Sequence, residues 1–129
     1  MQEETLQQFF LEEIDAQDLQ ELVQEELDRS EEEEPTYHYQ FRDMDTVHML
    51  EPYDLVRLCD AVLDEILVPE GLTLIANILT ESEKFDWEED VISEVCYFWL
   101  EHEENYDLAK PENLRQFRRW LKGEEPLPV

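Results

Sequence analysis

The stretch PYDLVRLCDAVLDEILVPEGLTLIANIL, residues 52–79, carries the strongest structural signal in this chain of 129 residues. After Pro52, apolar residues recur every three or four positions, with charged residues such as Arg57 on the opposite side, as in a helix with one buried face. Proline fits the first turn of a helix but cannot continue one. We therefore expect one helix to begin at Pro52 and to stop at Pro69, and a shorter helix to follow up to residues 81–82.

The segment VISEVCYFWL, residues 91–100, is apolar on nearly every side. A helix of that kind is normally buried, so we expect it to be the central helix of the domain. Asp86 and Glu89 precede it with the spacing of a capping box, which predicts that this helix starts there. A last helix opens at Pro111, and Gly123 suits the position just after its end.

Residues 1–34 are strongly acidic, and their apolar residues follow a helical spacing whose phase changes once. The change falls at Asp15, and Asp18 follows three residues later, which is typical of an N-cap that begins a new helix. We expect two short helices here, or one bent helix, ending before Pro35.

Residues 36–50 follow a different pattern. Aromatic residues take every second position of YHYQF at 37–41, and Val47 and Met49 repeat the alternation. A period of two is typical of strands, which predicts a small β-hairpin, with an irregular aromatic loop as the alternative. A lone hairpin is marginal in water, so it would have to lie against helices.

These segments together predict a mainly α-helical fold, a compact bundle of five or six helices with one small β-hairpin near residues 37–50. The length suits one domain overall. Its parts are an acidic helical arm, an aromatic loop or hairpin, a helical core and an extended tail, at residues 1–34, 35–50, 51–123 and 124–129.

The formal net charge of −27, from 36 acidic and 9 basic residues, is far larger than solubility demands. A small domain needs a net charge of only about 2 to 8 for that purpose, and the excess destabilises the compact state through self-repulsion. Phosphates and anionic lipid surfaces would be repelled, which argues against direct binding of nucleic acid or membranes. A positively charged partner protein is the expected binding partner.

The acidic residues of the second predicted helix form a regular row. They recur at intervals of three or four, at Asp18, Glu21, Glu25, Asp28 and Glu32. On a helix this spacing gives a carboxylate about every 5 Å along the axis, which resembles the anionic edge of a nucleic acid in sign and approximate periodicity. The alternative is an ordinary solvated helix face. The predicted partner-binding surface adds neighbouring acidic and aromatic residues, namely Glu31, Glu33, Glu34, Tyr37, Tyr39, Phe41, Glu101, Glu103 and Glu104.

Basic residues concentrate in the last predicted helix, at Lys110, Arg115, Arg118, Arg119 and Lys122. Arginine is well suited to pairing with carboxylates. We expect this helix to pair internally with the acidic body; a separate basic site for an anion is the alternative.

Motifs that carry catalysis or bind a cofactor are missing from the sequence. The cysteines and histidines lack zinc spacing, and HEENY at 102–106 has Tyr106 where the metalloprotease motif needs its second histidine. We therefore expect a non-catalytic protein without a metal or other cofactor. Cys59 and Cys96 fall within apolar helical patterns, which favours buried thiols in a cytoplasmic protein over a disulfide. The acidic N-terminus argues against a signal peptide.

These features indicate an acidic inhibitor or regulator that occupies the basic surface of a nuclease or another nucleic-acid-binding protein. In charge and size the chain is similar to bacterial immunity proteins of the barstar and colicin type, and to nucleic-acid mimics such as anti-restriction and anti-CRISPR proteins. That similarity is one of composition, without a shared motif. The alternative is an adaptor or assembly factor that docks in a larger complex through Phe9, Phe10 and residues 37–41. The oligomeric state is left open.

Overall fold

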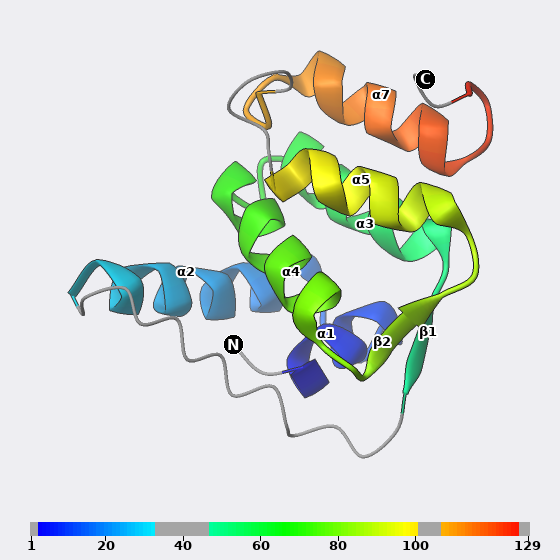
Figure 1. Cartoon of the computed structure of the whole chain (residues 1–129). Coiled ribbons are helices and arrows are strands. Elements are labelled where there is room, and N and C mark those ends of the chain that lie inside the picture. The colour runs from blue at the N-terminus through cyan, green and yellow to red at the C-terminus, as the bar shows by residue number, and fades with distance from the viewer. Residues whose placement is uncertain (1–2, 33–46, 101–106, 127–129) are drawn as a thin grey trace.

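The computed structural model describes residues 3–32, 47–100 and 107–126, and these residues form a mainly α-helical fold, as predicted. The described part contains six helices and one sheet of two short strands (Figure 1). In chain order the elements are α1 (Glu3–Phe10), α2 (Ala16–Glu32), β1 (His48–Leu50), α3 (Pro52–Leu63), α4 (Pro69–Glu81), β2 (Phe85–Trp87), α5 (Asp90–Leu100) and α7 (Pro111–Leu121).

The sheet differs from the expected hairpin. Strand β1 lies where the alternation at Val47 and Met49 predicts a strand, but it pairs in parallel with β2, in the register His48 with Phe85 and Leu50 with Trp87. Residues 37–41, which were to supply the other strand, lie outside the described residues. The parallel pairing buries Leu50 and Phe85 in the core, and it brings together the chain segments that enter α3 and α5.

The boundary between α3 and α4 corrects the expectation that a single helix runs to Pro69. Helix α3 ends at Leu63, and Glu65 takes a left-handed conformation with φ of 61°. The amide of Ile66 bonds back to the carbonyl of Ala61, which satisfies a free acceptor at the helix end. Pro69 is then the first residue of α4. The apolar spacing continues past Leu63 because Leu67, just after the exposed turn, is buried in the core.

The predicted start of α5 at Asp86 is also wrong. Asp86 lies in β2, where its carboxylate accepts a hydrogen bond from the amide of Trp87, and α5 begins only at Asp90. A reciprocal capping box is found instead at α3, where the side chain of Glu51 accepts from the amide of Asp54 and Asp54 accepts from the amide of Glu51. The pattern alone does not say whether the following residues are paired in a sheet.

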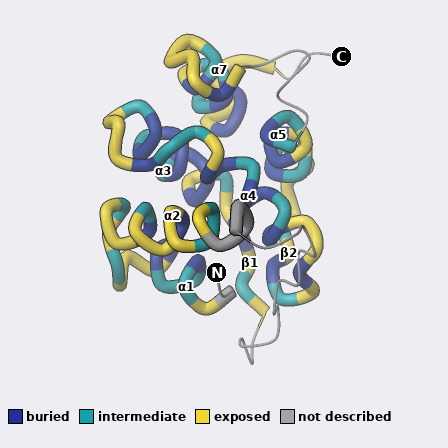
Figure 2. The backbone as a smooth tube through the Cα atoms, turned by 90° about the vertical axis from the view of Figure 1, so that its left-hand side faces the viewer, coloured by how far each residue is buried: buried dark blue, intermediate teal, exposed yellow. Residues whose placement is uncertain are grey.

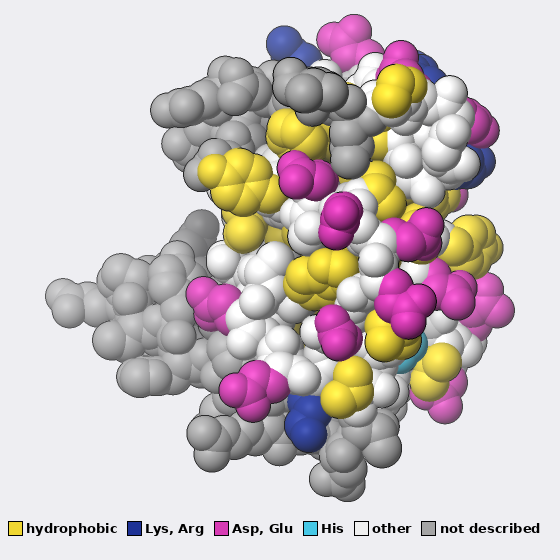
Figure 3. Space-filling model, turned by 45° about the vertical axis from the view of Figure 1, so that its right-hand side comes forward, with side chains coloured by type: hydrophobic (Ala, Val, Ile, Leu, Met, Phe, Trp, Pro, Cys, Tyr) yellow, Lys and Arg dark blue, Asp and Glu magenta, His cyan; other side chains and the backbone are white. Residues whose placement is uncertain are grey.

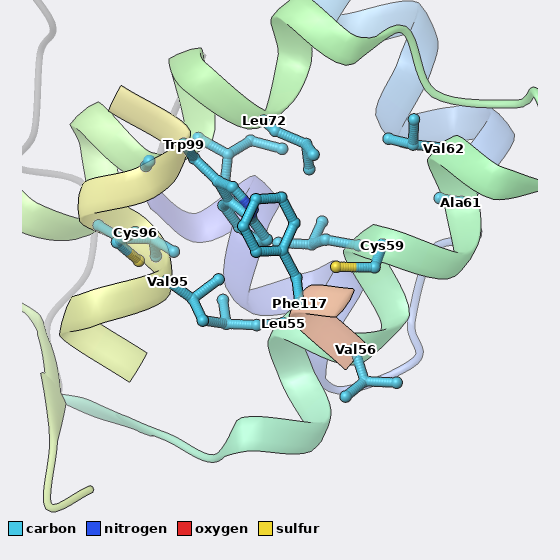
Figure 4. Close-up of a cluster of buried hydrophobic side chains, with 14 of the residues drawn as sticks. Leu55, Val56, Cys59, Ala61, Val62, Leu72, Val95, Cys96, Trp99 and Phe117 are labelled. Carbon is cyan, nitrogen blue, oxygen red and sulfur yellow. The ribbon is translucent and has the colours of Figure 1, made fainter. Parts of the chain in front are cut away.

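One hydrophobic core joins all of the elements. Helix α5 packs against α3, α4, α7 and β2, which confirms its central position, although Tyr97 on its outer side is 56% exposed. Trp99 of α5 lies beside Phe117 of α7, and Leu55 of α3 belongs to the same buried cluster (Figure 4). Helices α1 and α2 contribute to the same core through Leu6, Phe9, Phe10, Leu19 and Val23.

Arg57 attaches α1 to α3. Its guanidinium donates hydrogen bonds to the backbone carbonyls of Phe9 and Phe10, and lies 4.2 Å from the centre of the Phe9 ring. A cation at a helix C-terminus is favoured by the exposed carbonyls there. The sequence pattern placed Arg57 on the solvated side of α3, so the structure corrects that assignment.

The two cysteines are free and buried, as predicted. Burial raises the pKa of the Cys96 thiol to about 12. Burial, aided by the negative charge of Asp60, raises the pKa of Cys59 further. Because the thiolate is the reactive form, both thiols are inert in the folded protein at neutral pH.

Candidate protein-binding surface

The predicted row of carboxylates lies on the solvent side of α2. Asp18, Glu21, Glu25 and Asp28 are all exposed on this continuous helix. We call these four residues the α2 row. Among the residues that the structure describes, no Lys or Arg forms an ion pair with any of the four. The α2 row is therefore a line of negative charge that the described part of the fold leaves uncompensated.

The first turn of α2 is fixed by the predicted cap. The Asp15 carboxylate accepts a hydrogen bond from the amide of Asp18 at 2.9 Å, and the Asp18 carboxylate accepts one from the amide of Asp15 at 3.3 Å. These two bonds satisfy amides that would otherwise lack partners at the start of the helix. The break between α1 and α2 at Asp15 is thus confirmed, and Asp18 has a structural role beside its place in the α2 row.

The opposite side of α2 packs closely on α4. Leu19 and Val23 are buried there. A Cβ atom added to Gly71 of α4 would lie 3.2 Å from Cγ1 of Val23 and 3.1 Å from Cδ1 of Leu67, which is tighter than ordinary van der Waals contact. The missing side chain at Gly71 thus lets the two helices approach one another. Because α2 is held against the body, its outer face is a fixed surface.

A chain of side-chain amides runs along α2 from this contact to the α2 row. The Gln20 side chain accepts a hydrogen bond from the amide of Val68, at the start of α4, and donates to Gln24. Gln24 in turn donates to the Asp28 carboxylate at 2.9 Å. These bonds restrain Asp28, so less side-chain entropy is lost when a partner binds it.

The basic residues of α7 are partly used inside the fold. Arg118 forms an ion pair with Asp60 of α3, with 2.6 Å between Nε and Oδ1, which confirms the expected internal pairing at this position. Arg119 pairs with nearby Glu125 at 3.7 Å. Lys110, Arg115 and Lys122 are exposed. Helices α7 and α2 lie in different parts of the molecule (Figures 1 and 2), so the charge polarity predicted from sequence is also a polarity in space.

The remaining residues of the predicted surface stay predictions. Glu31 and Glu32 belong to α2, but their side chains lie outside the described part. The other predicted residues lie outside the described ranges altogether, namely Glu33, Glu34, Tyr37, Tyr39, Phe41, Glu101, Glu103 and Glu104. Phe9 and Phe10, which the adaptor hypothesis assigned to docking, are only 2% and 7% exposed, so that assignment is wrong.

Sequence reasoning missed a second acidic surface around β2. All seven acidic residues between positions 81 and 94 are exposed, namely Glu81, Glu83, Asp86, Glu88, Glu89, Asp90 and Glu94. The side of the molecule that carries the sheet shows acidic and hydrophobic side chains interspersed, with few basic ones among them (Figure 3). The run EEDVISE, residues 88–94, shows this charge in the sequence, but Asp86 and Glu89 were interpreted only as a helix cap.

None of the described helices is long and apolar enough to cross a membrane. Within residues 3–32, 47–100 and 107–126, no three His, Cys, Asp or Glu side chains are grouped so as to hold a metal ion. Comparisons of the chain with models of protein families, with curated proteins and with solved structures find no match. Function must therefore be inferred from geometry and charge.

Proposed function

We propose that this protein is a non-catalytic acidic inhibitor or regulator that occupies the basic, nucleic-acid-binding surface of a partner protein such as a nuclease. The observation that supports this is the α2 row, four exposed carboxylates on one fixed helix without an ion pair to any described cation. On this proposal the protein competes with nucleic acid for the same groove.

The electrostatic argument has two parts. The net charge of −27 produces a long-range field that speeds encounter with a basic partner. The α2 row then presents carboxylates about 5 Å apart along the helix axis, to which Lys and Arg side chains of a phosphate-binding groove can pair. Such side chains are arranged for a regular line of negative charges.

The packing of α2 contributes preorganisation. Close contact at Gly71 and the hydrogen bond from Val68 to Gln20 hold the helix in place before any partner arrives. A surface that does not have to be ordered on binding retains more of its interaction free energy. This favours an inhibitor that acts through a folded helix over a charged segment that folds on contact.

The test begins with capture of partners from a lysate of the source organism at low salt, followed by elution with increasing salt. The association rate of a captured partner is then measured with the wild-type protein and with the triple variant Glu21→Gln/Glu25→Gln/Asp28→Asn. Loss of three steering charges is expected to lower the association rate about tenfold at low salt and much less at high salt. Addition of the wild-type protein should release nucleic acid from the partner.

The matched control removes three charges from another part of the molecule, in Asp107→Asn/Glu112→Gln/Glu124→Gln. All three residues are exposed, and they lie in or beside α7, away from α2 (Figure 1). If both triple variants slow association equally, net charge alone acts and the α2 row has no special role. If the partner still binds nucleic acid when saturated, the inhibitor hypothesis is wrong.

An adaptor or assembly factor is the second candidate. Exposed apolar side chains at Val47, Met49 and Tyr53 favour it, because such residues supply binding energy that salt does not screen. A partner that stays bound at high salt and survives neutralisation of the α2 row would support this candidate over the inhibitor.

A further inference from the structure

The chain around β1 alternates strictly between outward and inward residues. Val47, Met49 and Tyr53 are 55%, 48% and 61% exposed, and Glu51 between them is also exposed. Successive side chains of a strand point to opposite faces, so Val47 and Met49 form an outward line, which we call the apolar rail. Tyr53 is a further exposed apolar side chain, in the first turn of α3.

The inward residues of β1 hold this line in place. His48 stacks on Phe10 with 5.6 Å between ring centres, and meets the edge of Phe85 at 5.9 Å. Its side chain also lies 3.7 Å from the Asp54 carboxylate, and Leu50 is buried. Because the inner face of the strand is anchored in the core, Val47 and Met49 cannot turn inward without breaking these contacts.

A line of carboxylates runs beside the apolar rail. Met49 is in register with Asp86 of β2, and Asp86 and Glu88 are both exposed. Neighbouring strands lie about 4.8 Å apart, so Asp86 lies next to Met49 on the outer face of the sheet, and Glu88 follows directly after the end of β2. Between residues 47 and 100 the chain has only two Lys or Arg residues. Of these, Arg57 is bound to α1 and Lys84 is half-buried.

We infer that this face of the sheet is a docking surface for a basic amphipathic helix of a partner protein. The chemistry of the two lines determines the occupant: an apolar stripe to cover Val47 and Met49, flanked by Lys or Arg opposite Asp86 and Glu88. Positions i and i+4 of a helix are about 6 Å apart along its axis, close to the roughly 6.6 Å between alternate residues of a strand. This surface is distinct from the α2 row and does not depend on the proposed inhibitor function.

The test uses the full chain and two fluorescent peptides of about four helical turns, made of Leu and Lys only. In the first, leucines at i, i+3, i+4 and i+7 form one stripe; in the second, the same residues are scrambled so that no stripe forms. Fluorescence anisotropy at low salt gives both dissociation constants. The striped peptide is expected to bind about tenfold more tightly, because desolvated apolar contacts add to the shared charge attraction.

Two pairs of variants and one further substitution locate the binding. Val47→Ser/Met49→Ser should abolish the preference for the striped peptide, whereas Leu11→Ser, at an equally exposed apolar position, should leave it unchanged. Tyr53 lies outside the sheet, in the first turn of α3, and Tyr53→Ser should also reduce the preference for the striped peptide. Asp86→Asn/Glu88→Gln should weaken binding more than Glu21→Gln/Glu25→Gln, which removes the same number of charges from α2. Circular dichroism and thermal unfolding verify that each variant is folded.

The inference is overturned by equal affinity for the two peptides, by no binding at low salt, or by a preference that survives Val47→Ser/Met49→Ser. If only neutralisation of Glu21 and Glu25 weakens binding, the docking surface is refuted, while the proposed role of the α2 row remains standing. The proposed function is refuted instead if the docking surface binds the striped peptide as expected and the α2 variants still associate with the captured partner at the wild-type rate.

Discussion

Helices α2 and α7 both cover the α3–α5 body from outside, yet they use their charges in opposite ways. In α7, Arg118 turns toward Asp60 of α3 and joins two elements of the fold. In α2, the carboxylates of Glu21 and Glu25 face solvent without a described cation beside them. A charged side chain is structural where it pairs with an opposite charge inside the fold, and it is available to a partner protein where no such pair forms.

The largest expected effect concerns the apolar anchors of the two helices. Phe117 of α7 is fully buried between Trp99 and Trp120, so Phe117→Ala should lower the free energy of unfolding by about 3–5 kcal/mol. Leu19→Ala in α2 should cost about 2–4 kcal/mol. Urea unfolding followed by tryptophan fluorescence and circular dichroism measures both. A larger loss for Leu19→Ala would mean that α2 is the more firmly held helix.

An intermediate effect is expected where α1 meets α3. Arg57→Ala removes the hydrogen bonds to the end of α1 and the contact with the Phe9 ring, which should cost about 1.5–3 kcal/mol. Hydrogen exchange should accelerate most for the amides of α1, because that helix loses its attachment. Arg115→Ala, at an exposed position of α7, is the control and should stay within about 0.5 kcal/mol of wild type. Equal effects of the two variants would show that Arg57 does not attach α1 to α3.

The smallest effect tests the charges themselves. Glu21→Gln/Glu25→Gln removes a like-charge pair one helical turn apart, so it should raise the free energy of unfolding by about 0.2–0.5 kcal/mol at low salt. Arg118→Gln should lower it by up to about 1 kcal/mol, because its ion pair with Asp60 is partly exposed. Both changes should shrink in high salt. A loss of stability in the α2 variant would show that its carboxylates are structural after all.

Local patterns predicted much of the helical fold. The Asp15 and Asp18 cap, the start of α3 at Pro52 and the left-handed Gly123 after α7 follow from sequence neighbours a few residues apart. The same reasoning failed at Asp86, because a capping motif and a short strand share the same residues and only a distant strand decides between them. It failed at Pro69 because Leu67, which follows the exposed turn at the end of α3, is buried and continues the apolar spacing.

For the candidate surfaces, the spacing of the α2 row was readable because helical periodicity places residues three or four apart on one side. For the apolar rail, the sequence predicted the strand but not the exposure of its side chains. Alternation marked Val47 and Met49 as strand residues, but their exposure depends on which face His48 and Leu50 bury against Phe10 and Phe85. The acidic line beside them depends on a register between residues 49 and 86.

The sequence by itself determined where most of the helices lie, the cap of α2 and the uneven distribution of charge, because each depends on residues within one or two turns of each other. The tertiary structure decided which charges are compensated, as at Arg118 and Asp60. It also decided which apolar residues stay outside and which side chain docks α1, as at Arg57. The physical reason is that ion pairs, strand register and helix contacts join groups far apart in the chain, whose meeting depends on the packing of the whole core.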